Sequence, residues 1–170
     1  MDDWLSLAIQ SGLERLEDHG ALVGLGNIDE FTFRAFVMAA IKERSLGATM
    51  QSEWRKYDLL VQATGRNHLV EFKCYILRRS MQLDGQPGKW KGGAGPKNEE
   101  EFQRNLHKLH ECSIASIHSR HMVLCYQRDY ARSSRHSFER SYGRIEPGEL
   151  IERVQWFDGE LLRCAWMTIR

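Results

Sequence analysis

Two strand-like runs in the middle of the chain constrain its fold most strongly. The runs, Tyr57–Gln62 and His68–Ile76, are rich in strand-favouring residues, and the segment Ala-Thr-Gly-Arg-Asn separates them. This arrangement predicts a β-hairpin, with its turn centred on Gly65-Arg66 because glycine tolerates a positive φ. Large apolar side chains alternate along both runs, so one face of the hairpin is expected to pack in the core.

Antiparallel pairing about that turn separates the side chains of the hairpin by parity. It places Asp58 opposite Lys73 and Leu60 opposite Glu71, and it makes Asp58 and Glu71 diagonal neighbours, with Cα atoms about 7–8 Å apart. The face expected to enter the core carries Leu59, Val61, Val70 and Phe72. The hydrophobic pattern therefore selects an arrangement that gathers Asp58, Glu71 and Lys73 on the opposite face.

Hydrophobic periodicity predicts the elements around this hairpin. Helices are expected over Asp3–Asp18, from Asn27 to just before Gly47, and from Asn98 through Leu109. Strands are expected near Thr49–Trp54 and over His121–Tyr126, and the tail fits a hairpin from Val154 to Ile169 that turns at Asp158-Gly159. The resulting order is α-α-β-β-β-α-β followed by a C-terminal hairpin.

The sequence also predicts the N-caps of two helices and the buried face of one of them. Asn27-Ile-Asp-Glu30 is typical of a capping box at the start of the second helix. The apolar face expected for that helix contains Phe31, Ala35, Met38, Ala39 and Ile41. Asn98 is expected to cap the third helix.

Composition describes an ordinary globular domain. The chain has 170 residues, a formal charge of +1 and 42% hydrophobic residues, so we expect a single domain over residues 1–170. No apolar run approaches the roughly 20 residues of a membrane span, and the start of the chain is acidic, so a cytoplasmic protein that does not bind membranes is expected. The four cysteines are expected to be reduced thiols, and no complete four-ligand zinc set is visible.

The gathered charges suggest a chemistry. Two converging carboxylates are hard oxygen ligands of the kind that Mg²⁺ accepts while it keeps several waters and binds substrate phosphate oxygens. A lysine beside them could orient or deprotonate a metal-bound water. The alternative is a surface salt bridge between Lys73 and the two acids, which is common and stabilises a fold little. Against it, these residues are expected in mid-strand among apolar neighbours, where such a trio costs desolvation and repulsion.

This pattern, Asp58 followed by Glu71-Phe72-Lys73, resembles the PD-(D/E)xK nuclease superfamily, the restriction-endonuclease-like fold. Tyr57 stands where the family name has Pro. The resemblance extends from about Ile28 to Tyr126 through the order helix, three strands, helix, strand. It implies an α/β fold with a central mixed β-sheet flanked by helices, and a metal-dependent nuclease that hydrolyses phosphodiester bonds, with DNA favoured over RNA.

The resemblance also implies the site residues. Asp58, Glu71 and the carbonyl of Phe72 would hold Mg²⁺, for which Mn²⁺ would substitute, and Lys73 would position the attacking water. Glu30 matches an acid that family members often add from the preceding helix, although it is equally the partner in the capping box. Gln103 matches a Gln-x-x-x-Tyr motif in which His107 replaces the Tyr, and the alternative is a solvated helix residue.

Nucleic acid is expected to approach across basic segments. The glycine-rich stretch from Arg78 to Lys97 has no periodicity and is expected to form a long loop that presents Lys89, Lys91 and Lys97. The segment Arg128–Arg144 carries five arginines and is the second candidate contact. A homodimer would be expected for paired double-strand cuts. The alternative function is a catalytically silent module of the same fold that binds nucleic acid or a protein partner.

Overall fold

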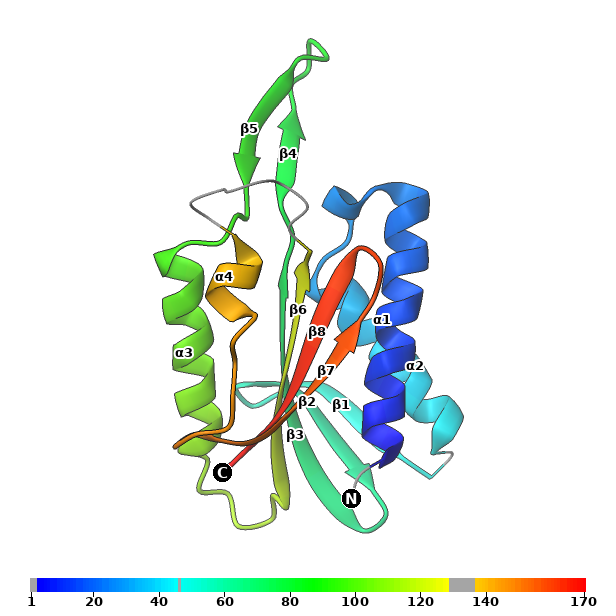
Figure 1. Cartoon of the computed structure of the whole chain (residues 1–170). Helices are drawn as coiled ribbons and strands as arrows, with labels where there is room; N and C mark the ends of the chain where they lie inside the picture. The colour runs from blue at the N-terminus through cyan, green and yellow to red at the C-terminus, as the bar shows by residue number, and fades with distance from the viewer. Residues whose placement is uncertain (1–2, 46, 129–136) are drawn as a thin grey trace.

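A computed structural model describes residues 3–45, 47–128 and 137–170 (Figure 1). Its centre is a six-stranded sheet whose strands, in spatial order, are β1 (Thr49–Trp54), β2 (Tyr57–Ala63), β3 (Arg66–Tyr75), β6 (Ser119–Gln127), β8 (Leu162–Ile169) and β7 (Ile151–Asp158). The helices are α1 (Asp3–Val23), α2 (Glu30–Arg44), α3 (Pro96–His110) and the short α4 (Phe138–Tyr142), and a 3-10 turn, η1 (Leu25–Asn27), follows α1.

The sheet is mixed and is covered on both faces. β3 and β6 are parallel and are joined through α3, whereas the other neighbouring strands are antiparallel. One core lies between the sheet and the pair α1 and α2, and a second core lies between the sheet and α3 with α4 (Figure 1). The predicted α/β class, with a mixed sheet flanked by helices, is confirmed. None of the helices in the described ranges is both long enough and apolar enough to cross a membrane.

The central hairpin forms as predicted, but its register differs. The turn is at Thr64-Gly65, where φ is 52° and 74°, and the pairs run from Ala63 with Arg66 to Leu59 with Val70. The pairing is thus offset by two residues from the predicted one, because both turn residues have positive φ, as a tight two-residue turn requires. A shift of two preserves parity, so the apolar face still enters the core beside α1 and α2.

Both predicted helix caps are wrong. Asp29 caps α2, because its Oδ1 accepts from the Thr32 N–H at 2.8 Å, while Asn27 lies in η1 and donates to the Val23 carbonyl. Gly95 is the N-cap of α3. In both cases the sequence offered several adjacent capping residues and the tertiary path of the chain selected one. Glu30 is consequently released from a capping box and is the first residue of α2.

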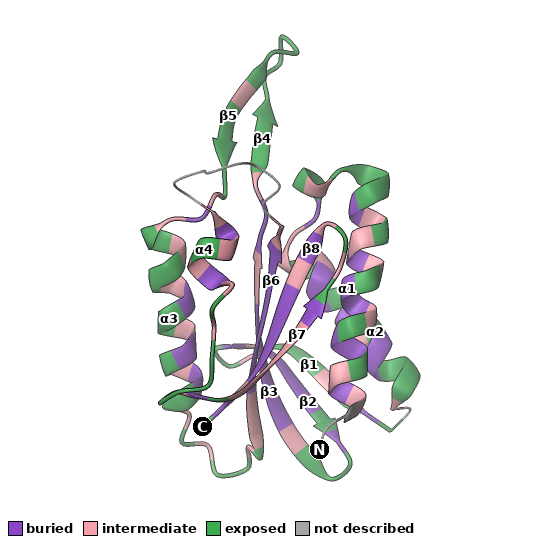
Figure 2. Cartoon of the chain, viewed as in Figure 1, coloured by how far each residue is buried: buried purple, intermediate pink, exposed green. Residues whose placement is uncertain are grey.

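The expected loop from Arg78 to Lys97 is instead a β-hairpin over most of its length. β4 (Arg78–Met81) pairs with β5 (Pro87–Lys91), and together they form a two-stranded sheet that projects from the body of the protein (Figure 1). The turn places Gly85 at a φ of 80°. Because this ribbon buries almost nothing, as Figure 2 shows, it has none of the alternating hydrophobicity by which a strand is recognised in a sequence.

The predicted C-terminal hairpin forms and is fixed by α1, but its turn is not at Asp158-Gly159, because Asp158 is the last residue of β7 and pairs with Arg163. β7 and β8 are antiparallel. The carboxylate of Glu17 accepts hydrogen bonds from the backbone N–H groups of Glu160, Leu161 and Leu162, at 2.7 to 3.1 Å. The carboxylate sits directly over Gly159, and a Cβ there would stand 2.2 Å from Glu17 Oε1 and displace it. The first helix therefore binds the last turn of the chain.

A buried polar network links three strands of the sheet. Trp166 Nε1 donates to His121 Nδ1 at 3.2 Å, and His121 Nε2 lies 2.8 Å from Ser119 Oγ. Ser119 Oγ in turn lies 2.7 Å from His68 Nδ1. Since Nδ1 of His121 is an acceptor, its ring hydrogen is on Nε2 and points to the serine. Burial, reinforced by His68 and Arg153, lowers the pKa of His121 to about 3 and keeps the ring neutral.

Candidate active site

β2 and β3 separate at Asp58, and we call the gap between Asp58 on β2 and Glu71, Phe72 and Lys73 on β3 the fork. The β1–β2 register pairs Ser52 with Leu59 and then Trp54 with Tyr57, and the β2–β3 register ends at Leu59 and Val70, so Asp58 is paired on neither side. Its backbone is bonded by side chains instead. The Asp58 N–H donates to Glu71 Oε2 at 3.2 Å, and its carbonyl accepts from Arg34 Nη1 at 3.1 Å.

The fork brings the two predicted acids directly across from each other. Continuing the observed register by one position sets Asp58 opposite Glu71, where the predicted register made them diagonal neighbours. Asp58 Oδ2 accepts from the Phe72 N–H at 2.7 Å. Because the N–H and the carbonyl of a strand residue point to the same neighbouring strand, the Phe72 carbonyl is also directed into the fork.

Glu71 is the most deeply buried acid of the fork. Its residue is only 3% exposed, and Glu71 Oε1 is bonded by the ammonium of Lys108 from α3. Burial and the charge of Asp58 raise the pKa of Glu71 to about 7, and Lys108 offsets this only in part. The site thus holds one carboxyl that gains or loses a proton near neutrality.

Lys73 contacts acidic residues of both α2 and α3, the helices on the two sides of the sheet. Its Nζ lies 3.2 Å from Glu30 Oε2 of α2 and 3.4 Å from Glu101 Oε1 of α3. Burial disfavours the ammonium, but Glu30, Glu101 and Asp58 outweigh it and raise the pKa of Lys73. Lys73 therefore stays protonated, so it could orient a neighbouring group or stabilise negative charge but is not suited to act as a base.

Glu30 reaches the site from the first turn of α2. Burial raises the pKa of Glu30, with further contributions from Asp58 and Glu101 that Lys73 opposes. The negative charge of Asp58 therefore raises the pKa of both Glu30 and Glu71, so the three carboxyl groups are close enough to repel one another. Arg34, one turn further along α2, balances part of it, with Nη1 3.6 Å from Asp58 Oδ1.

Five of the six predicted site residues lie at the fork, and Gln103 does not. Asp58, Glu71, Phe72, Lys73 and Glu30 are connected by the contacts described above. Gln103 is exposed and lines a cavity of about 460 Å³ that also contains Ser141 and Arg144. On an α-helix, the side chains of residues two positions apart point about 200° apart around the helix axis. Since Glu101 faces Lys73, Gln103 faces away from the carboxylates.

Three charged residues that contact the fork, Glu101, Lys108 and Arg34, were not predicted from the sequence. Glu101 and Lys108 are seven residues apart, so they share one face of α3, and that spacing was a signal that could have indicated both. No pattern in the sequence indicated Arg34. Arginine is rarely buried unless it is paired, and its partners are distant in the sequence, so it would be assigned to the exposed face of the helix.

The donor set suits one hard divalent cation better than a closed protein cage. Within residues 3–45, 47–128 and 137–170, no group of three or more His, Cys, Asp and Glu side chains is placed to hold a metal ion. Mg²⁺, however, is held in proteins by one or two carboxylates together with waters and substrate phosphates. Asp58, Glu71 and the Phe72 carbonyl fit that requirement, and a cation would relieve the repulsion that raises the pKa of Glu71.

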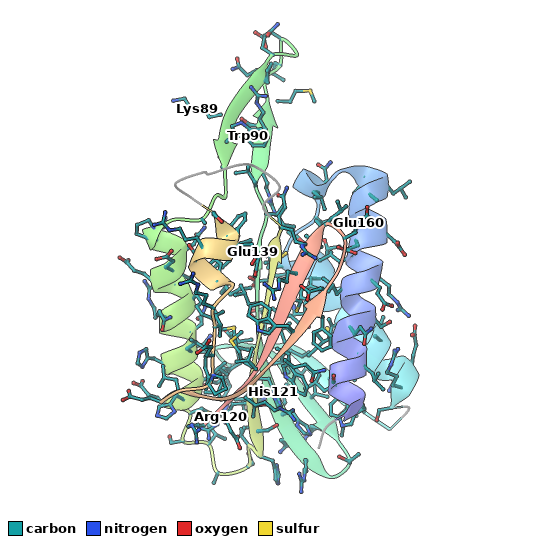
Figure 3. The ribbon with its side chains drawn as sticks, viewed as in Figure 1. Lys89, Trp90, Arg120, His121, Glu139 and Glu160 are labelled. Atoms are coloured by element: carbon teal, nitrogen blue, oxygen red, sulfur yellow. The ribbon has the colours of Figure 1, made fainter. Side chains whose placement is uncertain are left out.

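The expected basic contacts lie in different environments. Lys89 and Lys91 are on the exposed hairpin, where Figure 3 labels Lys89 and Trp90, and Lys97 is exposed at the start of α3. In the segment Arg128–Arg144, Arg128 donates to the Gly159 carbonyl, Arg140 and Arg144 are exposed, and residues 129–136 lie outside the described residues. The hairpin is therefore the one of the two predicted contact segments that the structure describes throughout.

Comparisons with known protein families, with curated proteins and with solved structures find no match to this chain.

Proposed function

We propose that this protein is a metal-dependent nuclease that hydrolyses phosphodiester bonds in DNA. The observation that carries the proposal is the fork, where Asp58 and Glu71 face each other across two strands and Lys73 lies next to them on the same face. Structural ion pairs do not need two acids whose proximity raises the pKa of one of them.

Each residue of the fork has a separate task in this proposal. Asp58 and Glu71, with the Phe72 carbonyl and Glu30, would hold Mg²⁺ or Mn²⁺. When bound, the ion would supply Lewis-acid activation of water and neutralise charge on the scissile phosphate. Lys73, fixed as an ammonium, would orient the attacking water. Arg34 and Lys108 hold the carboxylates in place from the two flanking helices.

The topology supports assignment to the restriction-endonuclease-like fold. The chain order runs from α2 through β1, β2 and β3 to α3 and β6, with the β4–β5 hairpin inserted between β3 and α3, and the site lies at the β2–β3 hairpin. Apart from that insertion, this is the order of helix, three strands, helix and strand on which the resemblance rests. Since one fold hosts many functions, the proposal rests on the site and not on this order.

Cleavage assays with matched variants test the proposal. Supercoiled plasmid, linear duplex, single-stranded DNA and RNA are incubated with wild type in Mg²⁺, Mn²⁺ or EDTA. The expected result is metal-dependent cutting of DNA that Asp58→Asn and Lys73→Met each reduce by at least about a hundredfold. Glu111→Gln, which changes an exposed acid beyond the end of α3, should cut as wild type does. Equal cutting by all four proteins would show contamination and contradict the proposal.

A second candidate function is a catalytically silent module that binds nucleic acid or a protein. It is favoured by the cations that already contact both carboxylates, Arg34 at Asp58 and Lys108 at Glu71. This candidate predicts binding that does not depend on metal and survives Asp58→Asn. Absence of cutting by wild type under every condition, together with such binding, would decide for it.

A further inference from the structure

The hairpin formed by β4 and β5, residues 78–91, begins beside the site and extends into solvent. Only two residues separate β4 from the end of β3, the strand that carries Lys73. The side chain of Arg78 donates to the Ile28 carbonyl at 2.8 Å, which ties the base of the hairpin to the start of α2 near Glu30. Figure 1 shows the rest of the hairpin standing clear of the other elements.

This hairpin exposes large apolar side chains. Toward its tip, Leu83 is 111% exposed and Met81 is 82% exposed, and nearer its base Trp90 is 59% exposed on β5. These are three of the seven large hydrophobic residues that are exposed in the described parts of the chain. A single exposed apolar residue needs no explanation, but two of them toward the tip of a projecting ribbon indicate a contact surface.

The flanks of the same hairpin are cationic. Residues 78–91 contain four basic residues, Arg78, Arg79, Lys89 and Lys91, against the single acid Asp84. The whole chain has a formal charge of only +1, so the remainder is net negative. The ribbon thus carries a local excess of positive charge, which favours contact with a polyanion.

The ribbon is held in one shape before it meets a ligand. The Arg79 guanidinium lies over the Trp90 ring, 5.3 Å from its centroid, and Arg79 Nε donates to the Gly88 carbonyl at 3.1 Å. Gly88 packs tightly on the opposite strand, since a Cβ there would stand 2.2 Å from Ser80 Oγ. Such contacts reduce the entropy that binding would cost.

We propose that this hairpin is a wedge that inserts Leu83 and Met81 between adjacent base pairs of duplex DNA. This inference rests on the proposed function and names its substrate class. Apolar wedges carried by basic segments unstack a base step and kink the duplex, at a cost that is smallest where stacking is already weak. The preferred substrate is therefore a DNA duplex with a local discontinuity, such as a mismatch or a nick, rather than an intact one.

Binding measurements with the full chain in EDTA test the wedge without relying on cleavage. Three labelled duplexes of one sequence are compared: continuous, singly mismatched and nicked, each with 2-aminopurine beside the central step. Wild type should bind the two interrupted duplexes about tenfold more tightly than the continuous one and should raise their 2-aminopurine fluorescence. Equal affinity for the three duplexes, or no binding to any of them, would overturn the proposal.

Variants separate the apolar tip from the charges. Leu83→Ser with Met81→Ser should keep the affinity for continuous duplex within about twofold but lose the preference and the fluorescence change. Lys89→Ala with Lys91→Ala should weaken binding to all three duplexes and lower the salt slope by about two. Leu22→Ser, which changes another exposed leucine on α1, should behave as wild type. A preference retained by the tip variant would also overturn the wedge.

The failure of this inference is distinguishable from the failure of the proposed function. Discrimination among the duplexes without any cutting would support the wedge proposal and contradict the proposed nuclease activity. Metal-dependent cutting without discrimination would do the reverse.

Discussion

Replacing Glu71 by glutamine should make the protein more stable at pH 8. The pKa of Glu71 is raised from 4.5 to about 7 by burial and by Asp58. Between these two values the folded protein holds a proton that the unfolded chain has released. The free energy of unfolding therefore falls as the pH rises from about 4.5 to 7, and above pH 7 the loss is complete.

The structure gives the size of this effect. Each pH unit between the two pKa values corresponds to about 1.4 kcal/mol, so ionised Glu71 costs about 3 kcal/mol at pH 8. Glutamine removes the charge and keeps an oxygen that can accept from the Asp58 N–H. Lys108 loses this carboxylate, but its Nζ still donates to the Lys56 carbonyl at 2.8 Å, and its side chain is partly exposed and can be solvated. The expected net gain is about 2 kcal/mol.

Urea denaturation in EDTA at pH 5, 6, 7 and 8 measures it. Wild type should lose stability across this range relative to Glu71→Gln, while the exposed-site control Glu111→Gln should follow wild type. If Glu71→Gln were less stable than wild type at pH 8, Glu71 and Lys108 would form an ordinary stabilising ion pair. The reasoning that the fork stores repulsion would then be refuted.

The same proteins test whether the repulsion serves a cation. At pH 8, Mg²⁺ at a hundred times its dissociation constant should raise the stability of wild type by about 2.7 kcal/mol. Glu71→Gln should gain much less, because one of the two carboxylates is gone. No effect of Mg²⁺ on wild type would favour the silent module of the second candidate function.

Three further predictions concern the fold. Because burial lowers the pKa of His121 to about 3, wild type should lose about 1.4 kcal/mol per pH unit below pH 6.5 relative to His121→Gln; parallel acid titrations of the two would contradict this. Gly12→Ala should cost about 1–3 kcal/mol in thermal unfolding, since its Cβ would stand 2.5 Å from Val37 Cγ2, and adding Val37→Ala should recover part of this loss, because the Val37 backbone is still 3.1 Å away. Glu17→Ala should cost about 2 kcal/mol in urea denaturation and Glu14→Ala, one turn away, almost nothing; equal losses would show a nonspecific effect.

The central hairpin shows how far the sequence determines a site. Hydrophobic alternation fixed which face each residue occupies, so Asp58, Glu71 and Lys73 were correctly grouped. The register was not determined, because a shift of two residues leaves the alternation unchanged. Only the positive φ values of Thr64 and Gly65 distinguish the observed turn from its neighbour, and a threonine in that conformation is uncommon.

Helix α2 shows a second limit. Its predicted apolar face contained Phe31, which is 63% exposed and lies under the Arg34 guanidinium at 4.8 Å. The buried residues of this helix are Phe33, Arg34, Val37, Ala40 and Ile41. A periodicity search assigns an arginine to the solvent side, yet here the fork provides carboxylate and carbonyl partners for it. Hydrophobic periodicity therefore gave the wrong buried face at Arg34, because this side chain is buried by its polar contacts with Asp58.

The hydrogen bonds of Glu17 impose an order on folding. They join residues that are 143 to 145 positions apart, so α1 cannot complete its contacts until the last strand has been synthesised. Its nearer partner, α2, is available early, and the two helices pack closely enough for Gly12 to contact Val37. Contacts between α1 and α2 can therefore form before those between α1 and the β7–β8 turn, whose long sequence separation slows their formation.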